Sequence, residues 1–250
     1  MPRSDRRSKL LRRLSEDGRA SVATLSRELG VTPSTIRRDL ARLADDGTLL
    51  RTYGGAAMGP AGRSASNNRD PAAAAKRAIG AAAAALVEDG QTVALSSGTT
   101  TLELARRLVD RRLTVITNAL DVASVLLDHE GIELVVLGGV VRPRMHSMLG
   151  HLAEMATREL RADALYMGIG AISLEHGLMN DSIPEILTDR ALRRIARQVV
   201  VLADASKFDL VAPAFVFGLE DVDVLVTDAT VRDEVVAGLE ARNVRVMIAR

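Results

Sequence analysis

Apolar side chains in the first 57 positions recur at the spacing of short amphipathic helices. The pattern predicts one helix over residues 6–16 and a second over residues 22–29, which Gly30 ends because glycine adopts the left-handed conformation at little cost. A third helix is predicted to begin at Pro33, because proline is preorganised for the first helical position. Residues 48–57 are predicted to form a short β-hairpin that turns near a pair of glycines.

From residue 91 onward, short apolar runs alternate with amphipathic stretches. Apolar runs rich in β-branched residues that alternate with helices are typical of a mostly parallel sheet with helices on both faces. The fold class predicted for this part is therefore α/β, with an open, mostly parallel sheet. The predicted strands are 92–95, 113–117, 132–137, 164–169, 199–203, 214–217, 222–226 and 244–248, and the predicted helices are 100–110, 119–128, 150–160, 184–197 and 231–241.

The two patterns are separated by a stretch of different composition. Residues 58–69 are rich in Gly, Ser, Asn and Pro, which is the composition of a linker. We therefore expect a small domain over residues 1–57, a linker over 58–71 and a larger domain over 72–250.

Charge is distributed unequally between the two parts. Residues 1–63 hold 13 Lys and Arg against 7 Asp and Glu, a net charge of +6, whereas residues 64–250 hold 20 against 25, a net charge of −5. A basic head on an acidic body suggests a polyanionic partner for the head alone. Solvated helix faces explain the same counts, so charge by itself leaves both interpretations open.

The composition also narrows the chemistry. The chain has no cysteine, which excludes disulfides and thiolate metal sites, and its four histidines are too scattered for a metal site, so neither metal nor cofactor is expected. No apolar run reaches the length of a membrane span, and the basic N-terminus lacks the apolar stretch of a signal peptide. A cytoplasmic protein without a membrane partner is the expectation.

Three short helices followed by a hairpin, with a tight turn between the second and third, form the pattern of a winged helix-turn-helix. The third helix of such a unit enters the major groove of DNA. Ile36, Leu40 and Leu43 are predicted to face the core, which leaves hydroxyls and arginines for base edges and phosphates. The predicted DNA-binding residues are Ser34, Thr35, Arg37, Arg38, Arg42 and, on the wing, Arg51.

A second candidate site lies where the predicted strands of the larger domain end. Residues 96–101 (Ser-Ser-Gly-Thr-Thr-Thr) connect a strand to a helix, and free backbone N–H groups at a helix start favour an anion such as phosphate. Ligands of open α/β sheets bind at the carboxyl ends of strands. The candidate effector-binding residues there are Ser97, Gly98, Thr99, Thr100, Thr101, Asn118, Gly138, Gly139, Gly168 and Lys207. Each also has a simpler interpretation as capping or turn chemistry.

These landmarks resemble a known family. Residues 35–40 (Thr-Ile-Arg-Arg-Asp-Leu) and 51–56 (Arg-Thr-Tyr-Gly-Gly-Ala) are similar to the signature of the DeoR family of regulators. Ser-Gly-Thr-Thr-Thr at 97–101, Thr-Asn at 117–118, Leu-Gly-Gly at 137–139 and Asp-Ala-Ser-Lys-Phe at 204–208 resemble the landmarks of that family's C-terminal domain. The resemblance covers nearly the whole chain.

The resemblance implies a C-terminal domain similar in fold to ribose-5-phosphate isomerase that binds a phosphorylated sugar and thereby alters operator binding. It implies that Ser97, Gly98, Thr99, Thr100 and Lys207 hold the phosphate and that Glu185 contacts the sugar. Two positions depart from the family pattern: Tyr53 stands where histidine is frequent, and Ser96 stands where an aspartate commonly precedes Ser-Gly-Thr. The loss of that carboxylate removes an acceptor for ligand hydroxyls. Residues 146–148 (His-Ser-Met) are a further candidate for the same cleft.

The function implied is a sequence-specific DNA-binding regulator, by analogy a repressor of sugar-metabolism genes, that self-associates as a dimer or tetramer and has no catalytic residues. An isomerase-like enzyme with an accessory DNA-binding domain is the alternative, in which Glu185 is the base and Lys207 an electrostatic stabiliser. A DNA-binding protein without a ligand is a third possibility, although it leaves the landmarks at the strand ends unexplained.

Overall fold

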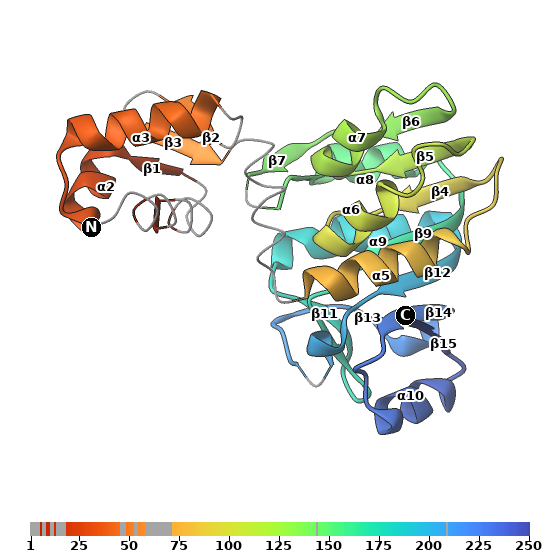
Figure 1. The fold of residues 1–250 in the computed structure, drawn as a ribbon. Helices are drawn as coiled ribbons and strands as arrows, with labels where there is room; N and C mark the ends of the chain where they lie inside the picture. The colour runs from red at the N-terminus through yellow and green to blue at the C-terminus, as the bar shows by residue number, and fades with distance from the viewer. Residues whose placement is uncertain are drawn as a thin grey trace. The chain divides into compact units, whose positions relative to one another are not determined.

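The structure is a computed structural model of the 250-residue chain. It describes Arg6, Lys9, Leu10, Arg13 and residues 19–45, 49–52, 55–58, 72–143, 145–208 and 210–250. The chain divides into two compact units, Met1–Ala73 and Ala74–Arg250, and each has its own hydrophobic core (Figure 1). Most of the expected linker, residues 59–71, lies outside the described residues, and Met58 belongs to a strand.

The first unit combines helices with a small antiparallel sheet. Its described helices are α2 (Val22–Leu29) and α3 (Pro33–Asp45), and the described residues Arg6, Lys9, Leu10 and Arg13 are helical where the first helix was predicted. The sheet contains β1 (Arg19–Ser21), β2 (Leu49–Thr52) and β3 (Gly55–Met58), in the order β1-β3-β2.

Local signals in the sequence account for the ends of α2. The Ser21 side chain accepts a hydrogen bond from the Thr24 N–H at 3.0 Å, which satisfies one of the free donors at a helix start. At the other end Gly30 adopts φ 63° and ψ 34°, the left-handed conformation that glycine tolerates best. The predicted boundaries of this helix are confirmed.

The core of the first unit is small. Leu10, Leu25, Ile36, Leu40 and Leu43 are all buried in it, which confirms that the predicted face of α3 points inward. The connection between α2 and α3 is short, and both helices contribute to this core, as in a helix-turn-helix.

The wing differs from the predicted hairpin by one strand. The hairpin of β2 and β3 is present, and β1 adds to it by pairing antiparallel with β3. A Cβ at Gly55 would collide with the carbonyl oxygen of Ala20 on β1. Glycine at position 55 is therefore required by the close approach of two strands, a constraint that local sequence does not reveal.

The second unit contains a sheet of seven strands that are all parallel. Its order is β15-β14-β12-β9-β4-β5-β6. The strands are β4 (Thr92–Leu95), β5 (Leu113–Thr117), β6 (Ile132–Val136), β9 (Ala162–Gly168), β12 (Ala196–Leu202), β14 (Val224–Asp228) and β15 (Arg245–Ala249). This agrees with the predicted open α/β sheet.

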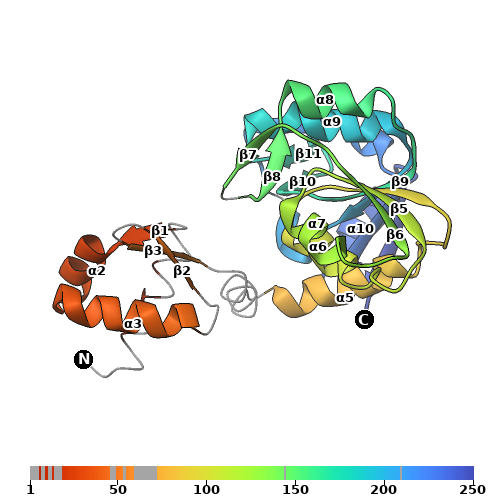
Figure 2. The ribbon, with the colours of Figure 1, turned by 90° about the horizontal axis from the view of Figure 1, so that it is seen from above.

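Helices cover both faces of the sheet, as Figure 2 shows. On one face, α5 (Ala73–Ala84), α6 (Thr99–Ala105) and α7 (Leu120–Leu126) share a core with alternate strand residues. On the other face lie α8 (His151–Thr157), α9 (Ile186–Ile195) and α10 (Asp233–Glu240), which share a second core with the remaining strand residues. The short 3₁₀ turn η1 (Ile183–Glu185) leads directly into α9.

Four short strands and one predicted strand depart from the expected pattern. Residues 214–217 were expected among the strands of the mostly parallel sheet; the bounds of this strand are confirmed, but its place in that sheet was wrong. They form β13 (Ala214–Phe217), which pairs antiparallel with β11 (Gly177–Asn180), and β11 pairs with β10 (Ala171–Ser173). A hairpin that was also not predicted joins β7 (Val140–Arg142) to β8 (Ser147–Leu149).

The strand order contains one reversal of direction. From β4 the chain adds β5 and β6 on one side, and it then returns to place β9, β12, β14 and β15 on the other side. The connections that leave the neighbouring strands β4 and β9 therefore diverge. In open α/β sheets, ligands bind at such a switch point, beyond the carboxyl ends of the strands.

Candidate functional site

The surface of α3 has the composition expected of a DNA-reading helix. Ser34, Arg37, Arg38 and Arg42 are exposed, and Thr35 is half-buried. All five predicted side chains on this helix therefore lie away from the core or at its margin. Arg51 lies in β2, but its side chain is outside what the structure describes, as is all of Tyr53.

Two sets of contacts hold α3 in place, one at its start and one at its middle. The Thr32 hydroxyl lies 3.0 Å from both the Ser34 and the Thr35 hydroxyl oxygens. Arg6 of the first helix donates from Nε to the carboxylate of Asp39 at 2.6 Å, and both side chains are largely buried. Asp39 thus holds α3 against the first helix, whereas its neighbours Arg37 and Arg38 remain available to a partner.

In the second unit, the loop after β4 meets the end of β9 at the switch point. A Cβ at Gly168 would lie 3.6 Å from the Thr101 hydroxyl oxygen and 3.8 Å from the Ser97 carbonyl oxygen. Gly98 adopts φ 140°, a backbone conformation that favours glycine, and a Cβ there would meet only Thr101. Four predicted residues, Ser97, Gly98, Thr101 and Gly168, therefore lie together, and a Cβ at either glycine would be in ordinary van der Waals contact with this group.

Asn118 follows β5 and is almost fully buried. Its Nδ2 donates to the Met148 carbonyl oxygen at 3.2 Å, which joins it to β8. Thr117 sets the turn before it, because its hydroxyl donates to the Leu95 carbonyl oxygen and accepts from the Ala119 N–H. Asn118 thus lies one strand away from the loop that follows β4.

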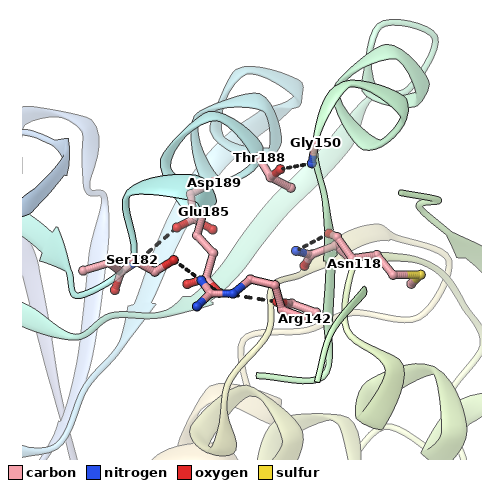
Figure 3. A network of polar contacts seen from close by, with 10 residues as sticks. Asn118, Arg142, Gly150, Ser182, Glu185, Thr188 and Asp189 are labelled. Atoms are coloured by element: carbon pink, nitrogen blue, oxygen red, sulfur yellow. Dashed lines mark hydrogen bonds and ion pairs between the residues drawn. The ribbon is translucent and has the colours of Figure 1, made fainter. Parts of the chain in front are cut away.

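Glu185 lies at the centre of a polar network that Figure 3 shows. Arg142, at the end of β7, donates from one terminal nitrogen to the Glu185 carboxylate at 3.1 Å and to the Ser182 hydroxyl. The Ser147 hydroxyl donates to the same carboxylate oxygen at 3.4 Å. The β7–β8 hairpin and the start of α9 are therefore tied together by the residue that the sequence predicted to contact a sugar.

Asp189 lies one turn after Glu185 and has an unusual pKa. Burial raises the pKa of Asp189 to about 7, with a further contribution from the nearby charge of Glu185 and an opposing one from the Asn180 hydrogen bond. Asn180 donates to Asp189 at 2.9 Å and accepts from the Gly170 N–H at 2.8 Å. The loop after β9 is thereby attached to α9.

Lys207 is half-buried and lies in the 3₁₀ turn η2 (Ala205–Lys207), which follows β12. Asp204 caps this turn and accepts from the Ser206 N–H at 3.1 Å. Asp228, at the end of β14, accepts from the Ala205 N–H at 2.7 Å. Burial raises the pKa of Asp228, but hydrogen bonds from Thr230 and the backbone outweigh it, and the net pKa lies below the usual range. The turn that carries Lys207 is therefore held at two points.

Two predicted glycines have different surroundings. A Cβ at Gly139 would collide with the carbonyl of Leu149, so glycine there is accounted for by the pairing of β7 with β8. Gly138 has open space around it. The candidate residues 146–148 also differ in their surroundings. Ser147 bonds to Glu185 and the Met148 carbonyl accepts from Asn118, whereas His146 pairs with Asp121 at 2.8 Å.

Several residues at this edge of the sheet were not predicted from the sequence. Arg142, Asn180, Ser182 and Asp189 all take part in the network, and none stands out as a motif. Asp189 follows Glu185 at the i, i+4 spacing of a helix face, which is the one local signal that links them.

Neither a metal site nor a membrane span is found in the part of the chain that the structure describes. No group of three or more His, Cys, Asp or Glu side chains there is arranged to hold a metal ion. None of its helices has both the length and the apolar character needed to cross a membrane.

Comparison with solved structures finds a partial likeness. Ribose-5-phosphate isomerase A from Methanocaldococcus jannaschii covers 53% of this chain and 53% of its own, with a TM-score of 0.40 and 20% sequence identity. The beta subunit of eIF2B from Chaetomium thermophilum covers 60% of this chain and 47% of its own, with a TM-score of 0.44 and 19% identity.

Comparison with known sequences is more informative. The transcriptional repressor AccR of Agrobacterium fabrum is 35% identical over 91% of this chain and 90% of its own, and the HTH-type regulator GolR of Listeria innocua is 32% identical over 90% of each. The DeoR-like helix-turn-helix domain matches residues 6–59, and the DeoR C-terminal sensor domain matches residues 72–229. Because the two matches together span most of the sequence and relatives match it over nearly their whole length, the chain belongs to the DeoR family of transcriptional regulators.

Proposed function

We propose that this protein is a repressor whose operator binding is controlled by a phosphorylated sugar. The observation that carries the proposal is that one chain contains both domains of the family: a helix-turn-helix with an exposed basic helix and a sensor domain with buried polar groups at its switch point. Relatives are named as transcriptional repressors, among them AccR and the repressor CsqR of Escherichia coli. The regulator interpretation is therefore preferred to the isomerase alternative.

In this proposal α3 binds the major groove of operator DNA. Ser34 and Thr35 lie in the first turn of the helix, from which recognition helices contact base edges. Arg37, Arg38 and Arg42 are exposed and offer bidentate donors to guanine or single contacts to phosphates. Arg51 on the wing is proposed to contact the backbone beside the groove.

The phosphate of the effector is proposed to bind in the loop after β4. The Ser97–Gly98–Thr99–Thr100 backbone turns there into α6, and Thr101 closes the space toward Gly168. Lys207 is proposed to supply the cation, and Asp204 and Asp228 hold its turn in place. Glu185, Asn118 and Gly138 would then face the remainder of the ligand from the other side of the switch point.

Regulation is proposed to act through an oligomer. A pair of heads binds two half-sites, so the sensor domain must bring two copies of the chain together. Apolar side chains that are exposed on the β7–β8 hairpin and on α8 offer a surface for this, namely Val140, Val141, Met145, Leu152 and Met155. The effector changes operator affinity only as far as it binds the two arrangements of the heads with different affinity, typically 5–150-fold.

Fluorescence anisotropy of the DNA upstream of the gene, at about physiological salt, tests the proposal, because affinity for DNA depends steeply on salt. Random duplex is the control, and a panel of pentose and hexose phosphates is added at saturation. Selective binding that one sugar phosphate reverses is the expected result. Operator binding that no phosphorylated sugar alters would contradict the proposed effector class.

Lys207→Ala sharpens the same experiment. We expect this variant to bind the operator with unchanged affinity but to lose the response to the sugar phosphate, because Lys207 lies in the sensor domain and far along the chain from α3. Simultaneous loss of operator binding and response would instead indicate a folding defect, which circular dichroism would show.

A further inference from the structure

A carboxylate interrupts the basic part of α3. Between Pro33 and Arg42 this helix contains three arginines and a single acidic residue, Asp39. Asp39 lies one helical turn after Thr35 and one turn before Arg42, so the three side chains share a flank of the helix. Arg42 is exposed, Thr35 is half-buried and Asp39 is 9% exposed, which places Asp39 at the border between the face that carries the proposed DNA contacts and the core.

The dimensions of DNA place this flank beside phosphates. The major groove is about 12 Å wide, and a helix with its side chains measures about 10–12 Å across. A helix that lies in the groove therefore fills it from one wall to the other, and the walls are the two sugar-phosphate backbones. Side chains at the flank of α3 face these walls. A carboxylate at this position requires an explanation, because the phosphates repel it.

Arg6 of the first helix packs against this flank and has unused donors. Its Nε donates to the Asp39 carboxylate at 2.6 Å, and Asp39 is its one hydrogen-bond partner among the described residues. A guanidinium carries five N–H groups, so this bond leaves the four on the terminal nitrogens. The Arg6 side chain is 14% exposed, and its terminal nitrogens are not among the fully buried atoms that lack a partner. They are therefore accessible to a ligand.

The ion pair gives the Arg6 guanidinium a fixed direction. A long side chain loses conformational entropy when a ligand immobilises it, and the bond to Asp39 restricts Arg6 before DNA arrives. The planar guanidinium can hold a carboxylate on one edge and a phosphate on another, which the compact charge of lysine does less well. In the same contact Arg6 neutralises the carboxylate that would otherwise repel the DNA backbone.

We propose that Arg6 contacts a phosphate of operator DNA through its terminal nitrogens and that Asp39 is the residue that positions it. The inference rests on the proposed binding of α3 in the major groove, and it is independent of the effector. It extends the DNA-binding surface from α3 and the wing to the first helix. The alternative is an ion pair that only joins two helices, and the two roles differ in their response to salt.

The salt dependence of DNA binding by the full chain tests the inference. Fluorescence anisotropy is read with the upstream duplex that the wild type binds selectively, over a series of salt concentrations. Each phosphate contact contributes about 0.9 to the slope of log Kd against log salt concentration, because it releases a counterion from the DNA. Arg6→Gln removes the cation. Arg13→Gln is the matched control, because Arg13 also belongs to the first helix but pairs with Glu28 of α2.

We expect Arg6→Gln to lower the slope by about 0.9 for each bound head and Arg13→Gln to leave it unchanged. Arg6→Lys should retain the slope of the wild type, because it keeps the charge, and should bind more weakly at every salt concentration, because it lacks the planar geometry. A purely structural ion pair changes the thermal midpoint of the variants but not the slope.

A second variant covers the case in which Arg6→Gln does not fold. Removal of one partner leaves a buried charge unpaired, whereas the double variant Arg6→Gln, Asp39→Asn replaces the ion pair with two neutral amides. The double variant should show the same lowered slope as Arg6→Gln. It should also bind DNA more tightly than Arg6→Gln, because the carboxylate that repels the phosphates is gone. Circular dichroism at each salt concentration shows that the variants are folded.

Two results would overturn the inference while the proposed function stands. The first is a wild-type slope in the double variant, which would leave Arg6 and Asp39 as a structural ion pair. The second is an equal fall in slope for Arg13→Gln, which would attribute the effect to the net charge of the first unit. A wild-type chain that binds no duplex selectively overturns both proposals together.

Discussion

The two candidate sites of this protein are built in opposite ways. On α3 the proposed DNA contacts are exposed or half-buried side chains within nine residues of one another, and the buried residues of the same helix do the packing. At the sheet edge Asn118 and Glu185 are themselves buried, and they are held by partners 30 to 43 residues away in the chain. The DNA-reading surface is thus separable from the fold, whereas the sensor site is part of the fold.

This difference has a functional consequence. Arg142 and Ser147 join the β7–β8 hairpin to Glu185 at the start of α9, and Asn180 joins the loop after β9 to the same helix. A ligand that competes for any of these groups must alter contacts between several elements. A site of this kind suits a sensor, while a surface of independent side chains suits recognition of a fixed partner such as DNA.

The largest effect is expected for Ile36→Ala, which tests whether the packing face of α3 is needed for its reading face. Ile36 is fully buried in a small core, and such truncations cost about 2–5 kcal/mol. We expect faster hydrogen exchange throughout the first unit and loss of operator binding, with unchanged exchange in the strands of the second unit. Leu127→Ala, at an exposed position of the second unit outside the proposed oligomer surface, is the control. Unchanged exchange in α3 would show that this core is not needed to order the helix.

Asp189→Asn tests the sensor site, where the polar side chains are part of the fold and therefore affect its stability. The pKa of Asp189 is raised to about 7 in the folded chain, above the ordinary value near 4. Between these values the unfolded chain releases the proton while the folded chain retains it, so stability falls as pH rises from about 4 to 7. The loss is on the order of 4 kcal/mol, because one pKa unit corresponds to about 1.4 kcal/mol.

Urea unfolding at several pH values measures this effect. Asp189→Asn should remove the decline with rising pH, whereas Asp128→Asn, which changes an exposed carboxyl just after α7, should leave it. A wild-type profile that is flat between pH 4 and 8 would contradict the burial of an ionisable carboxyl in this network.

Arg38→Ala tests the exposed face itself. If Arg38 binds a base edge, the variant should lose about 1–3 kcal/mol of operator affinity, roughly 5–150-fold in Kd, and discriminate less at one base pair. Its thermal midpoint should not change, because the side chain is exposed. Arg197→Ala, an exposed arginine of the second unit, is the matched control. Operator binding equal to that of the wild type would show that Arg38 lies outside the groove.

The smallest effect is expected at the cap of α2. Ser21→Ala removes the hydrogen bond to the Thr24 N–H and should cost about 1 kcal/mol, whereas Ser21→Thr retains the acceptor. Hydrogen exchange at the start of α2 reads the difference. Equal exchange in the two variants would mean that the 3.0 Å contact contributes nothing to the helix.

Local sequence determined much of this protein. The boundaries of α2, the inward face of α3 and the central strands followed from periodicity, capping residues and β-branched runs, because these features act through neighbours along the chain. The family resemblance then added Glu185 and the implied roles of the other candidate residues.

The tertiary structure decided what depends on distant parts of the chain. The strand order with its switch point, the transfer of β13 to a separate antiparallel sheet and the need for Gly55 beside β1 have no local signal. The same holds for the pairing of Arg142 with Glu185, the raised pKa of Asp189 and the pairing of Arg6 with Asp39. Burial and hydrogen-bond partnership are properties of three-dimensional packing, and residues that acquire their character from it can be recognised only once the chain is folded.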